Sequence, residues 1–261
     1  MDFNTDDHIE DNENKFCSLW TKCRRIDSCA NLFLNSKFKG DYFFNRLNNV
    51  QTCDKIECTL DTVSKICSKE RQDVYIHIPY VPNNYELINI LLKKGFRYLD
   101  TMYVLMIRNH HHVIDDGHTH RILDVKAKNE LDIWTRAFCE SFSIRSWKYE
   151  VSKIINRNIS RFILIVTYIA EKPEYPVGCM LLHKYHGITG LYCLGTLKPF
   201  RRRGIATKMI KFATYYKRKK NTKFLIAHSL SNENTINLYK NLGFEVVQVK
   251  KIFVSKCFSN A

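Results

Sequence analysis

Apolar residues follow two different periods along the second half of the chain. Between residues 129 and 141 they recur at every third or fourth position, which is the spacing of one helix face. Residues 162–170 form an almost continuous apolar run, which is typical of a buried strand. The whole pattern predicts, in order, strand 121–126, helices 129–141 and 147–156, strands 162–170, 177–184 and 191–196, helix 205–218, strand 224–228, a helix containing Tyr239, and strands 244–249 and 252–256. This order predicts an α/β domain with a mixed sheet and helices on both faces.

The segment Leu191–Lys208 joins a predicted strand to a predicted helix through three arginines and a glycine. Because Gly204 has no Cβ, its backbone can turn tightly and a ligand can approach the main chain there. The free N–H groups of a helix's first turn and the helix dipole then favour an anion. The segment is not a P-loop, because no Gly-Lys-Ser/Thr follows, and it carries one of the three glycines of a dinucleotide fingerprint. It therefore predicts a phosphate-binding turn of another kind.

Two motifs in this part of the chain resemble those of one enzyme family. Arg201-x-x-Gly204-x-Ala206 is similar to the Arg/Gln-x-x-Gly-x-Gly/Ala motif of the GNAT N-acetyltransferases. Residues 232–244, NENTINLYKNLGF, are similar to the family's Asn-x-x-Ala-x-x-x-Tyr-x-x-x-Gly-Phe, with Thr235 in place of alanine. The resemblance covers residues 118–256 and implies a GNAT fold with a mixed, mostly antiparallel sheet.

The resemblance also implies a co-substrate, acetyl-CoA, and residues that bind it. Backbone groups of β-strand residues would bind the pantetheine arm, the arginine turn would hold the pyrophosphate, and Asn232 would contact the cofactor from the other side. Tyr239 corresponds to the residue that protonates the departing thiolate, whereas its alternative role is that of a core aromatic. The implied cofactor-binding residues are Leu194, Gly195, Thr196, Leu197, Arg201, Arg202, Arg203, Gly204, Ile205, Ala206, Thr207 and Asn232.

The base that removes a proton from the acceptor amine has no clear sequence signal. Strand 191–196 carries no acidic residue, so the candidates are Glu140, His183 and His186. Cys193 has the chemistry to take up the acetyl group covalently. A buried strand cysteine is the more ordinary interpretation, and direct attack by the amine is the route that the resemblance implies.

The first half of the chain carries a weaker copy of the second motif. Residues 84–96 align without a gap on residues 232–244 and share Asn84, Ile88, Asn89, Gly95 and Phe96 with them. Predicted strands at 74–78 and 103–107 flank this helix, as in the second half. No glycine turn of the first motif occurs between residues 40 and 79, and Leu91 replaces the tyrosine. This pattern predicts a tandem GNAT whose degenerate, smaller N-terminal α/β lobe binds no CoA and completes the acceptor side of the cleft.

Composition divides the chain into four predicted parts. Residues 1–16 carry six acids and one lysine, which predicts a mobile acidic tail. The degenerate lobe would then span 17–108 and the catalytic domain 120–257. Residues 109–119 and His120 contain five histidines with nearby carboxylates, a set that could hold zinc or nickel, but adjacent histidines favour a polar linker.

The ten cysteines and the apolar runs bear on the cellular compartment. Six cysteines lie between Cys17 and Cys67 without a Cys-x-x-Cys pair. Free buried thiols are the favoured interpretation, and a disulfide or metal in the first lobe is the alternative. The chain shows no signal peptide and no apolar run long enough to cross a membrane, which predicts a soluble cytoplasmic protein without membrane contact.

Charge adds a competing functional hypothesis. The chain carries 41 basic against 26 acidic residues, for a net charge of +15. The cluster Lys217–Lys220 suits a helix C-terminus, and it also has the charge of a nucleic-acid-binding surface. The favoured function is acetyl-CoA-dependent N-acetyl transfer to a primary amine of a small molecule or protein by direct attack. The alternative is a non-catalytic GNAT-like module that binds CoA or RNA through this basic helix.

Overall fold

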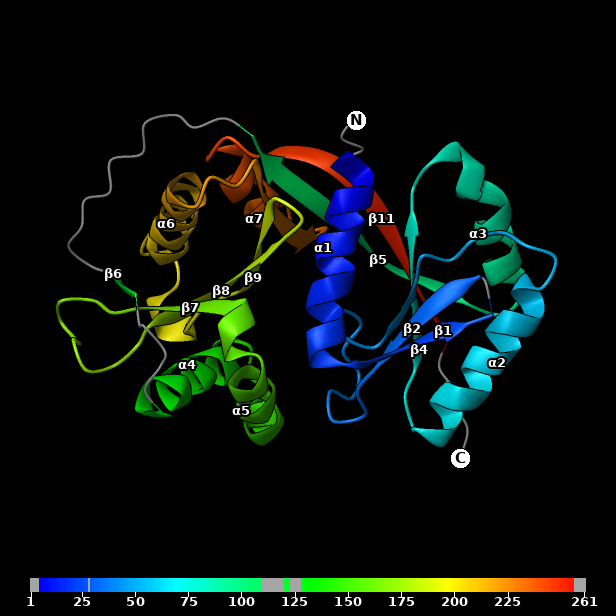
Figure 1. The fold of residues 1–261 in the computed structure, drawn as a ribbon, viewed down its shortest axis with the longest axis horizontal. Helices are drawn as coiled ribbons and strands as arrows, with labels where there is room; N and C mark the ends of the chain where they lie inside the picture. The colour runs from blue at the N-terminus through cyan, green and yellow to red at the C-terminus, as the bar shows by residue number, and fades with distance from the viewer. Residues whose placement is uncertain (1–4, 28, 109–119, 123–127, 256–261) are drawn as a thin grey trace. The chain divides into compact units, whose positions relative to one another are not determined.

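The computed structural model describes residues 5–27, 29–108, 120–122 and 128–255 (Figure 1). The chain divides into two compact units that differ from the predicted bounds. Unit 1 consists of Met1–Glu13, Leu105–His228 and Glu233–Glu245, and unit 2 consists of Asn14–Val104, Ser229–Asn232 and Val246–Ala261. Each unit therefore contains segments from both ends of the chain.

Unit 1 has an α/β architecture that follows the predicted order of elements. Its strand order is β10-β9-β8-β7-β6, in which β6 to β9 run antiparallel in turn and β10 is parallel to β9. Its elements are β6 (His120–Ile122), α4 (Lys128–Ser141), η2 (Arg145–Trp147), α5 (Lys148–Arg157), η3 (Ile159–Arg161), β7 (Phe162–Thr167), β8 (Gly178–Tyr185), β9 (Ile188–Thr196), η4 (Lys198–Phe200), α6 (Ile205–Lys219), β10 (Phe224–Leu230, whose end belongs to unit 2) and α7 (Glu233–Lys240).

Helices cover both faces of this sheet, as the amphipathic pattern predicts. Helix α6 lies on one face of β7–β9, and α4 and α5 lie on the opposite face (Figure 1). Trp134 of α4 is fully buried, and its indole Nε1 donates a hydrogen bond to the Met180 carbonyl at 3.0 Å. On the other face, a Cβ at Gly178 would lie 2.9 Å from the Met209 side chain, so this glycine lets α6 pack closely on β8.

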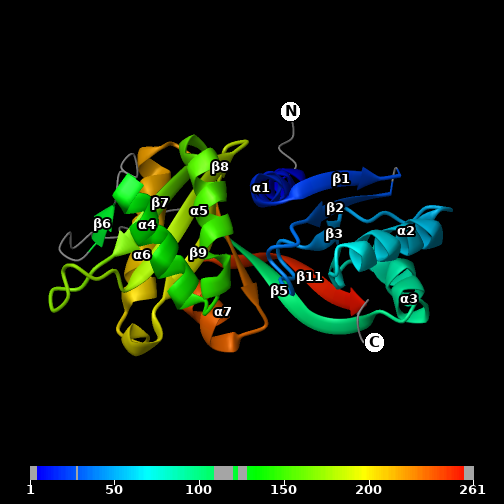
Figure 2. The same ribbon diagram turned by 90° about the horizontal axis from the view of Figure 1, so that it is seen from below.

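Unit 2 contains the N-terminal strands and the last strand of the chain. Its strand order is β1-β2-β3-β4-β11-β5, and β11 lies alongside β5 (Figure 2). Its elements are β1 (Lys22–Ile26), β2 (Ala30–Leu34), β3 (Arg46–Asn48), α2 (Ile56–Lys69), β4 (Val74–Pro79), η1 (Pro82–Asn84), α3 (Tyr85–Lys93), β5 (Arg97–Ile107, whose end belongs to unit 1) and β11 (Glu245–Ser255). The apolar faces of α2 and α3 form the core with β2, β3 and β4.

The predicted internal repeat is visible in the order of elements. The series β3-α2-β4-α3-β5 corresponds to β9-α6-β10-α7-β11, and in both copies the first two strands are parallel. The last strand of the second copy, β11, pairs antiparallel with β4 of the first copy, from Lys250 opposite Pro79 to Ser255 opposite Val74. One continuous β11 replaces the two closing strands predicted at 244–249 and 252–256. Because β11 belongs to unit 2, the predicted domain 120–257 is not one compact unit.

The prediction of a mobile acidic tail is wrong. Residues Thr5–Trp20 form helix α1, whose first part belongs to unit 1. Ile9, Phe16 and Trp20 are buried because they share one helical face, and Glu13 is 0% exposed. The high acid content hid this face, although acidic residues in a helix's first turn are favourable.

The favoured interpretation of buried thiols holds for two of the six cysteines between Cys17 and Cys67. Cys29 and Cys53 form a disulfide, which was the alternative for the first lobe. The other described cysteines form no disulfide: Cys23 and Cys58 are exposed, Cys193 is half-buried, and Cys17, Cys67, Cys139 and Cys179 are buried. The histidine linker of residues 109–119 lies outside the described residues. In the described part of the chain, no helix has both the length and the apolar character needed to span a membrane.

Lys217 of α6 gives a testable pH dependence of stability. Its side chain is 1% exposed, and its Nζ donates to the Arg108 carbonyl at 2.8 Å. Burial lowers the pKa of Lys217 from about 10.5 to about 8. Between these values the unfolded chain binds the proton and the folded chain does not, so this residue makes stability rise with pH. Below about pH 8 both states are protonated, and charging the buried amine costs about 3 kcal/mol.

We therefore expect Lys217→Met to be more stable than the wild type by about 1–2 kcal/mol at pH 7, because the variant buries no charge. The gain is smaller than the full cost of charging the amine, since the Arg108 carbonyl loses its hydrogen-bond donor. This advantage should shrink between pH 8 and 10. Urea unfolding of both proteins at several pH values measures the difference. A constant difference across this range would contradict the assignment.

Candidate active site

Strands β9 and β10 of unit 1 are paired along part of their length and then diverge. Their parallel pairing runs from Ile188 opposite Phe224 to Leu191 opposite Ala227, and β9 continues from there to Thr196. On its other side β9 contains an irregularity, because its register with β8 shifts between Cys179 and Leu181. Cys193, at this irregularity, has a positive φ of 54°. Backbone groups of β9 after Leu191 therefore face β10 without a ladder partner on it, which suits a polar, extended ligand.

The turn that follows β9 leads into an uncapped helix. Gly204 is the N-cap of α6 with φ 75°, and no side chain caps the helix there. A Cβ placed on Gly204 would meet no heavy atom within 4 Å, so the space in front of it is open. The first helical hydrogen bond joins the Lys208 N–H to the Gly204 carbonyl at 3.0 Å. The three N–H groups before it, on Ile205–Thr207, point out of the helix end and can donate to an anion.

The three arginines of the turn have different roles. Arg201 donates to the carbonyls of Thr196 and Ser141, at 3.0 Å each, and so ties the turn to β9 and α4. Arg203 forms an ion pair with Glu171 at 2.9 Å. Arg202 has φ 65° and is exposed, and its side chain has no partner among the described residues. The exposed guanidinium of Arg202 is therefore open to a phosphate.

The remaining predicted β9 residues are held by α4. A Cβ at Gly195 would lie 2.6 Å from the Ser141 Cβ and 2.9 Å from the Phe142 ring, so only glycine fits this contact. Leu197 is buried, and Leu194 and Thr196 are half-buried. The structure thus brings 194–197 and 201–207 together within unit 1.

Tyr239 lies on α7 and is almost fully buried, at 3% exposure. Its ring packs edge-on against Phe244 with centroids 5.2 Å apart, and burial raises the pKa of its hydroxyl. The phenol is therefore neutral at physiological pH and carries a proton to give. Asn232 immediately precedes α7 and is exposed, but it is assigned to unit 2, whereas Tyr239 belongs to unit 1.

A buried polar cluster that sequence reasoning missed lies where β9 and β10 part. His228 follows the last paired residue of β10, and its Nε2 lies 3.1 Å from a carboxylate oxygen of Glu13. The exposed fractions of the two side chains are 7% and 0%. Tyr192 follows the last paired residue of β9 and stacks on the His228 ring, with centroids 5.6 Å apart. The Tyr192 hydroxyl donates to Asn12 at 2.9 Å.

The three predicted base candidates lie elsewhere on unit 1. Glu140 accepts a hydrogen bond from the Tyr175 hydroxyl at 2.8 Å. His183 is buried, and its Nδ1 lies 3.1 Å from the Arg161 carbonyl. His186 occupies the turn between β8 and β9 and lies 3.5 Å from Asp11. None of the three is on the open part of β9.

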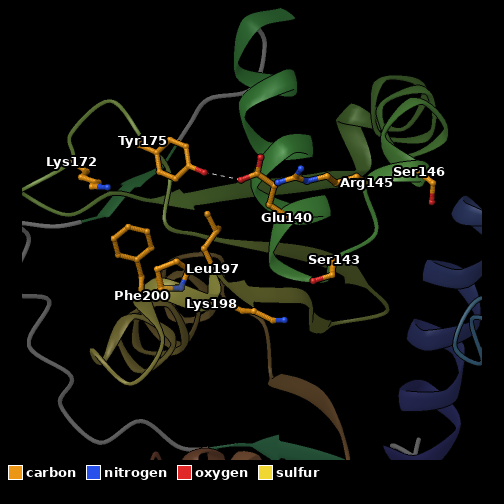
Figure 3. A pocket seen from close by; sticks show the side chains of 10 residues that line it. Glu140, Ser143, Arg145, Ser146, Lys172, Tyr175, Leu197, Lys198 and Phe200 are labelled. Carbon is orange, nitrogen blue, oxygen red and sulfur yellow. Dashed lines mark hydrogen bonds between the residues drawn. The ribbon is translucent and has the colours of Figure 1, made fainter.

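A pocket of about 740 Å³ lies beside the arginine turn (Figure 3). In it the Tyr175 hydroxyl points toward Glu140. Three cationic side chains and one carboxylate give the pocket a polar, mainly basic lining. The residues that line it are Glu140, Ser143, Arg145, Ser146, Lys172, Tyr175, Leu197, Lys198, Pro199 and Phe200.

Comparison with known proteins agrees with this geometry. A sequence model described as the Acetyltransferase (GNAT) family matches residues 129–244. This segment is a GNAT acetyltransferase domain. The match contains all of the glycine turn, the pocket, His228 and Tyr239. It does not contain Glu13.

A curated relative and two solved structures extend the comparison. The chain is 35% identical over 65 residues to N-alpha-acetyltransferase 50 from Danio rerio, which is 24% of this chain and 39% of the relative. A GCN5-related N-acetyltransferase from Kribbella flavida has a TM-score of 0.69 at 12% identity, with 95% and 94% of the two chains covered. A tandem GNAT protein from the clavulanic acid biosynthesis pathway has a TM-score of 0.60 at 8% identity, with 97% of each chain covered.

These likenesses confirm the predicted fold class, including the tandem arrangement. The family generally uses acetyl-CoA as acetyl donor. The residues present fit that group, because the open space at Gly204 and the uncapped α6 can accept phosphates and the unpaired part of β9 can accept amides.

Proposed function

We propose that the chain is an acetyl-CoA-dependent N-acetyltransferase that delivers an acetyl group to a primary amine by direct attack. The observation that carries this proposal is the sequence of features along one segment. A strand that loses its partner at Leu191 is followed by a left-handed glycine and the uncapped N-terminus of α6. Acetyl-CoA would supply an activated thioester, and residues of unit 1 would bind it, orient it and protonate the departing thiolate.

Binding uses main-chain groups more than side chains. The N–H groups of Ile205–Thr207 and the positive end of the helix dipole hold the pyrophosphate, and Arg202 adds a mobile charge. Arg201 acts through the main chain, because its hydrogen bonds fix the turn to Thr196 and Ser141. Main-chain groups from Leu194 to Leu197, at the end of β9 and directly after it, orient the pantetheine arm.

His228 is the group that we assign as the proton acceptor. It sits where the strands part, and Glu13 fixes its Nε2 by the 3.1 Å contact. A buried carboxylate–imidazole pair usually stabilises a fold less than a well-packed apolar pair of similar volume. Its presence here therefore favours a chemical role over a structural one. Glu13 acts through His228 and is a positioning residue. The proton of the attacking amine passes to His228, and Tyr239 gives its proton to the departing sulfur.

The pocket beside η4 is the proposed acceptor site. It adjoins the turn that holds the cofactor, and its cations and its carboxylate can hold polar groups next to an amine. The matched relative is named an N-alpha-acetyltransferase. An N-terminal α-amine of a polypeptide is therefore the first acceptor to test.

The non-catalytic alternative needs the basic cluster of α6 on the surface. Lys217 does not meet this requirement, because its amine is buried against the Arg108 carbonyl. A binding module also has no use for a buried Glu13–His228 pair. Arg218, Lys219 and Lys220 are exposed, so the Glu13–His228 pair is the observation that favours catalysis.

The proposed function is tested with the full chain, acetyl-CoA and short peptides that differ in their N-terminal residue, with polyamines as a second panel. The expected result is equal amounts of released CoA and acetylated amine, identified by mass spectrometry. An N-terminally blocked peptide is the control and should release no CoA. Absence of turnover with every amine, while acetyl-CoA binds, would favour the binding module.

Tyr239→Phe is expected to lower kcat by roughly 10²-fold, because the ring remains and the donated proton is lost. The affinity for acetyl-CoA should stay within about twofold, since the packing against Phe244 is kept. Tyr216→Phe, on α6, is the matched control. Unchanged turnover in Tyr239→Phe would make this tyrosine structural.

A further inference from the structure

Helix α1 and the turn between β8 and β9 bring three metal-binding side chains together. His8 and Asp11 come from α1, and His186 comes from the turn. One ligand atom from each of the three residues lies within 4.8 Å of the other two. All three residues belong to unit 1. His186 lies within the segment that the family model matches, whereas His8 and Asp11 lie outside it.

The local structure explains why these side chains converge. His8 and Asp11 are three residues apart on a helix, so they lie on the same face. Tyr185 pairs with Ile188, which leaves His186 and Gly187 as a two-residue hairpin turn with φ of 45° and 76°. Such a turn needs left-handed residues, and histidine is one of the side chains that adopt this conformation more readily than most. The Tyr185 ring stacks on the His186 ring at 4.0 Å and holds its orientation.

The distance between Asp11 and His186 suits a shared metal ion better than a hydrogen bond. His186 Nδ1 lies 3.5 Å from Asp11 Oδ2, which is long for a hydrogen bond. Two ligands bound about 2.0–2.1 Å from a tetrahedral ion are about 3.3–3.5 Å apart. The His8 and His186 rings meet edge to face at 5.8 Å, so the two imidazoles can approach one ion from different directions.

We propose that His8, Asp11 and His186 bind one divalent transition-metal ion, with zinc as the best fit. Two imidazoles and a carboxylate are typical zinc ligands, and water fills the fourth position. Asp11 and His186 are about half exposed, so the ion can enter from solvent. The ion fastens α1 to the hairpin where Asn12 already donates to the Ile188 carbonyl at 3.1 Å. Because Glu13 follows on the same helix, the ion also steadies the partner of His228.

The test uses the full chain, stripped with a chelator, kept reduced and titrated with zinc by calorimetry. We expect one site per chain from these residues and a rise in Tm. His8→Gln and His186→Asn should each weaken this site roughly 100-fold, and asparagine is chosen because it tolerates the left-handed turn. Glu10→Gln, on the same helix, is the matched control and should bind zinc like the wild type.

Cobalt substitution separates this site from the chain's cysteines, because nitrogen and oxygen ligands give visible ligand-field bands without thiolate charge-transfer bands. A variant with His110, His111 and His112 all changed to glutamine separates it from the linker, and it should keep the site. Zinc binding that survives both His8→Gln and His186→Asn, or that shows thiolate bands alone, would overturn the proposal, as would no binding at all. Every readout is metal binding, so failure of the proposed acetyl transfer does not affect this outcome.

Discussion

Replacing Gly204 with valine is expected to weaken acetyl-CoA binding by roughly 100-fold, or about 3 kcal/mol. Gly204 adopts φ 75°, which a β-branched residue rarely adopts, and its open side is the space that the phosphates would occupy. A valine there both fills this space and turns the first N–H groups of α6 away. Calorimetric titration of the wild type and the variant with acetyl-CoA gives the two affinities.

Gly95 supplies a matched control for the strain itself. It has φ 83° and open space around its Cβ position, and it corresponds to Gly243 of the second copy, so it lies outside the proposed phosphate-binding turn. Gly95→Val should lose a similar amount of stability, about 1–3 kcal/mol, and keep its affinity for acetyl-CoA. Normal binding by Gly204→Val would show that the phosphates are held elsewhere.

Replacing His228 with glutamine is expected to lower kcat by roughly 10²- to 10⁴-fold, because the acceptor amine then loses its proton to solvent alone. The loss should become smaller as the pH is raised, since more of the amine is then already deprotonated. Glu13→Gln should give a smaller loss, about tenfold, because the imidazole remains but its orientation is less fixed. Acetyl-CoA affinity should stay near that of the wild type in both variants.

His183→Gln controls for the loss of any buried histidine from unit 1. His183 lies on β8 and is buried at 2% exposure, and its ring contacts the carbonyl of Arg161 of η3 instead of the Glu13 carboxylate. Its variant should keep most of the wild-type kcat once folding is verified by thermal unfolding. Equal losses in the His183 and His228 variants, with no pH dependence, would mean that His228 is structural.

Local sequence signals predicted the elements of the second half closely. The helical period at residues 129–141 and the glycine before 205–218 gave α4 and α6 to within two residues. These signals are local, because a helix face and a helix start are each set by neighbouring residues. The repeat of residues 84–96 predicted the tandem arrangement for the same reason, since α3 and α7 keep the same pattern.

Contacts between distant segments could not be predicted in this way. Glu13 and His228 are separated by 215 residues, and a stretch with six acids shows no sign that one of them is buried. The pairing of β11 with β4 depends on long-range strand order, which no local period encodes. The different tasks of Arg201 and Arg202 depend on which carbonyls lie within reach, and that is known only once α4 and β9 are in place.

We propose that the N-terminus of α6 receives the phosphates of acetyl-CoA. Amide NMR of the isotope-labelled full chain, recorded as CoA is added, observes these N–H groups themselves. The N–H signals of Ile205, Ala206 and Thr207 should move downfield and approach saturation together, because these groups begin to donate to phosphate oxygens. Unchanged signals at these three positions, with shifts confined to other parts of the chain, would contradict it.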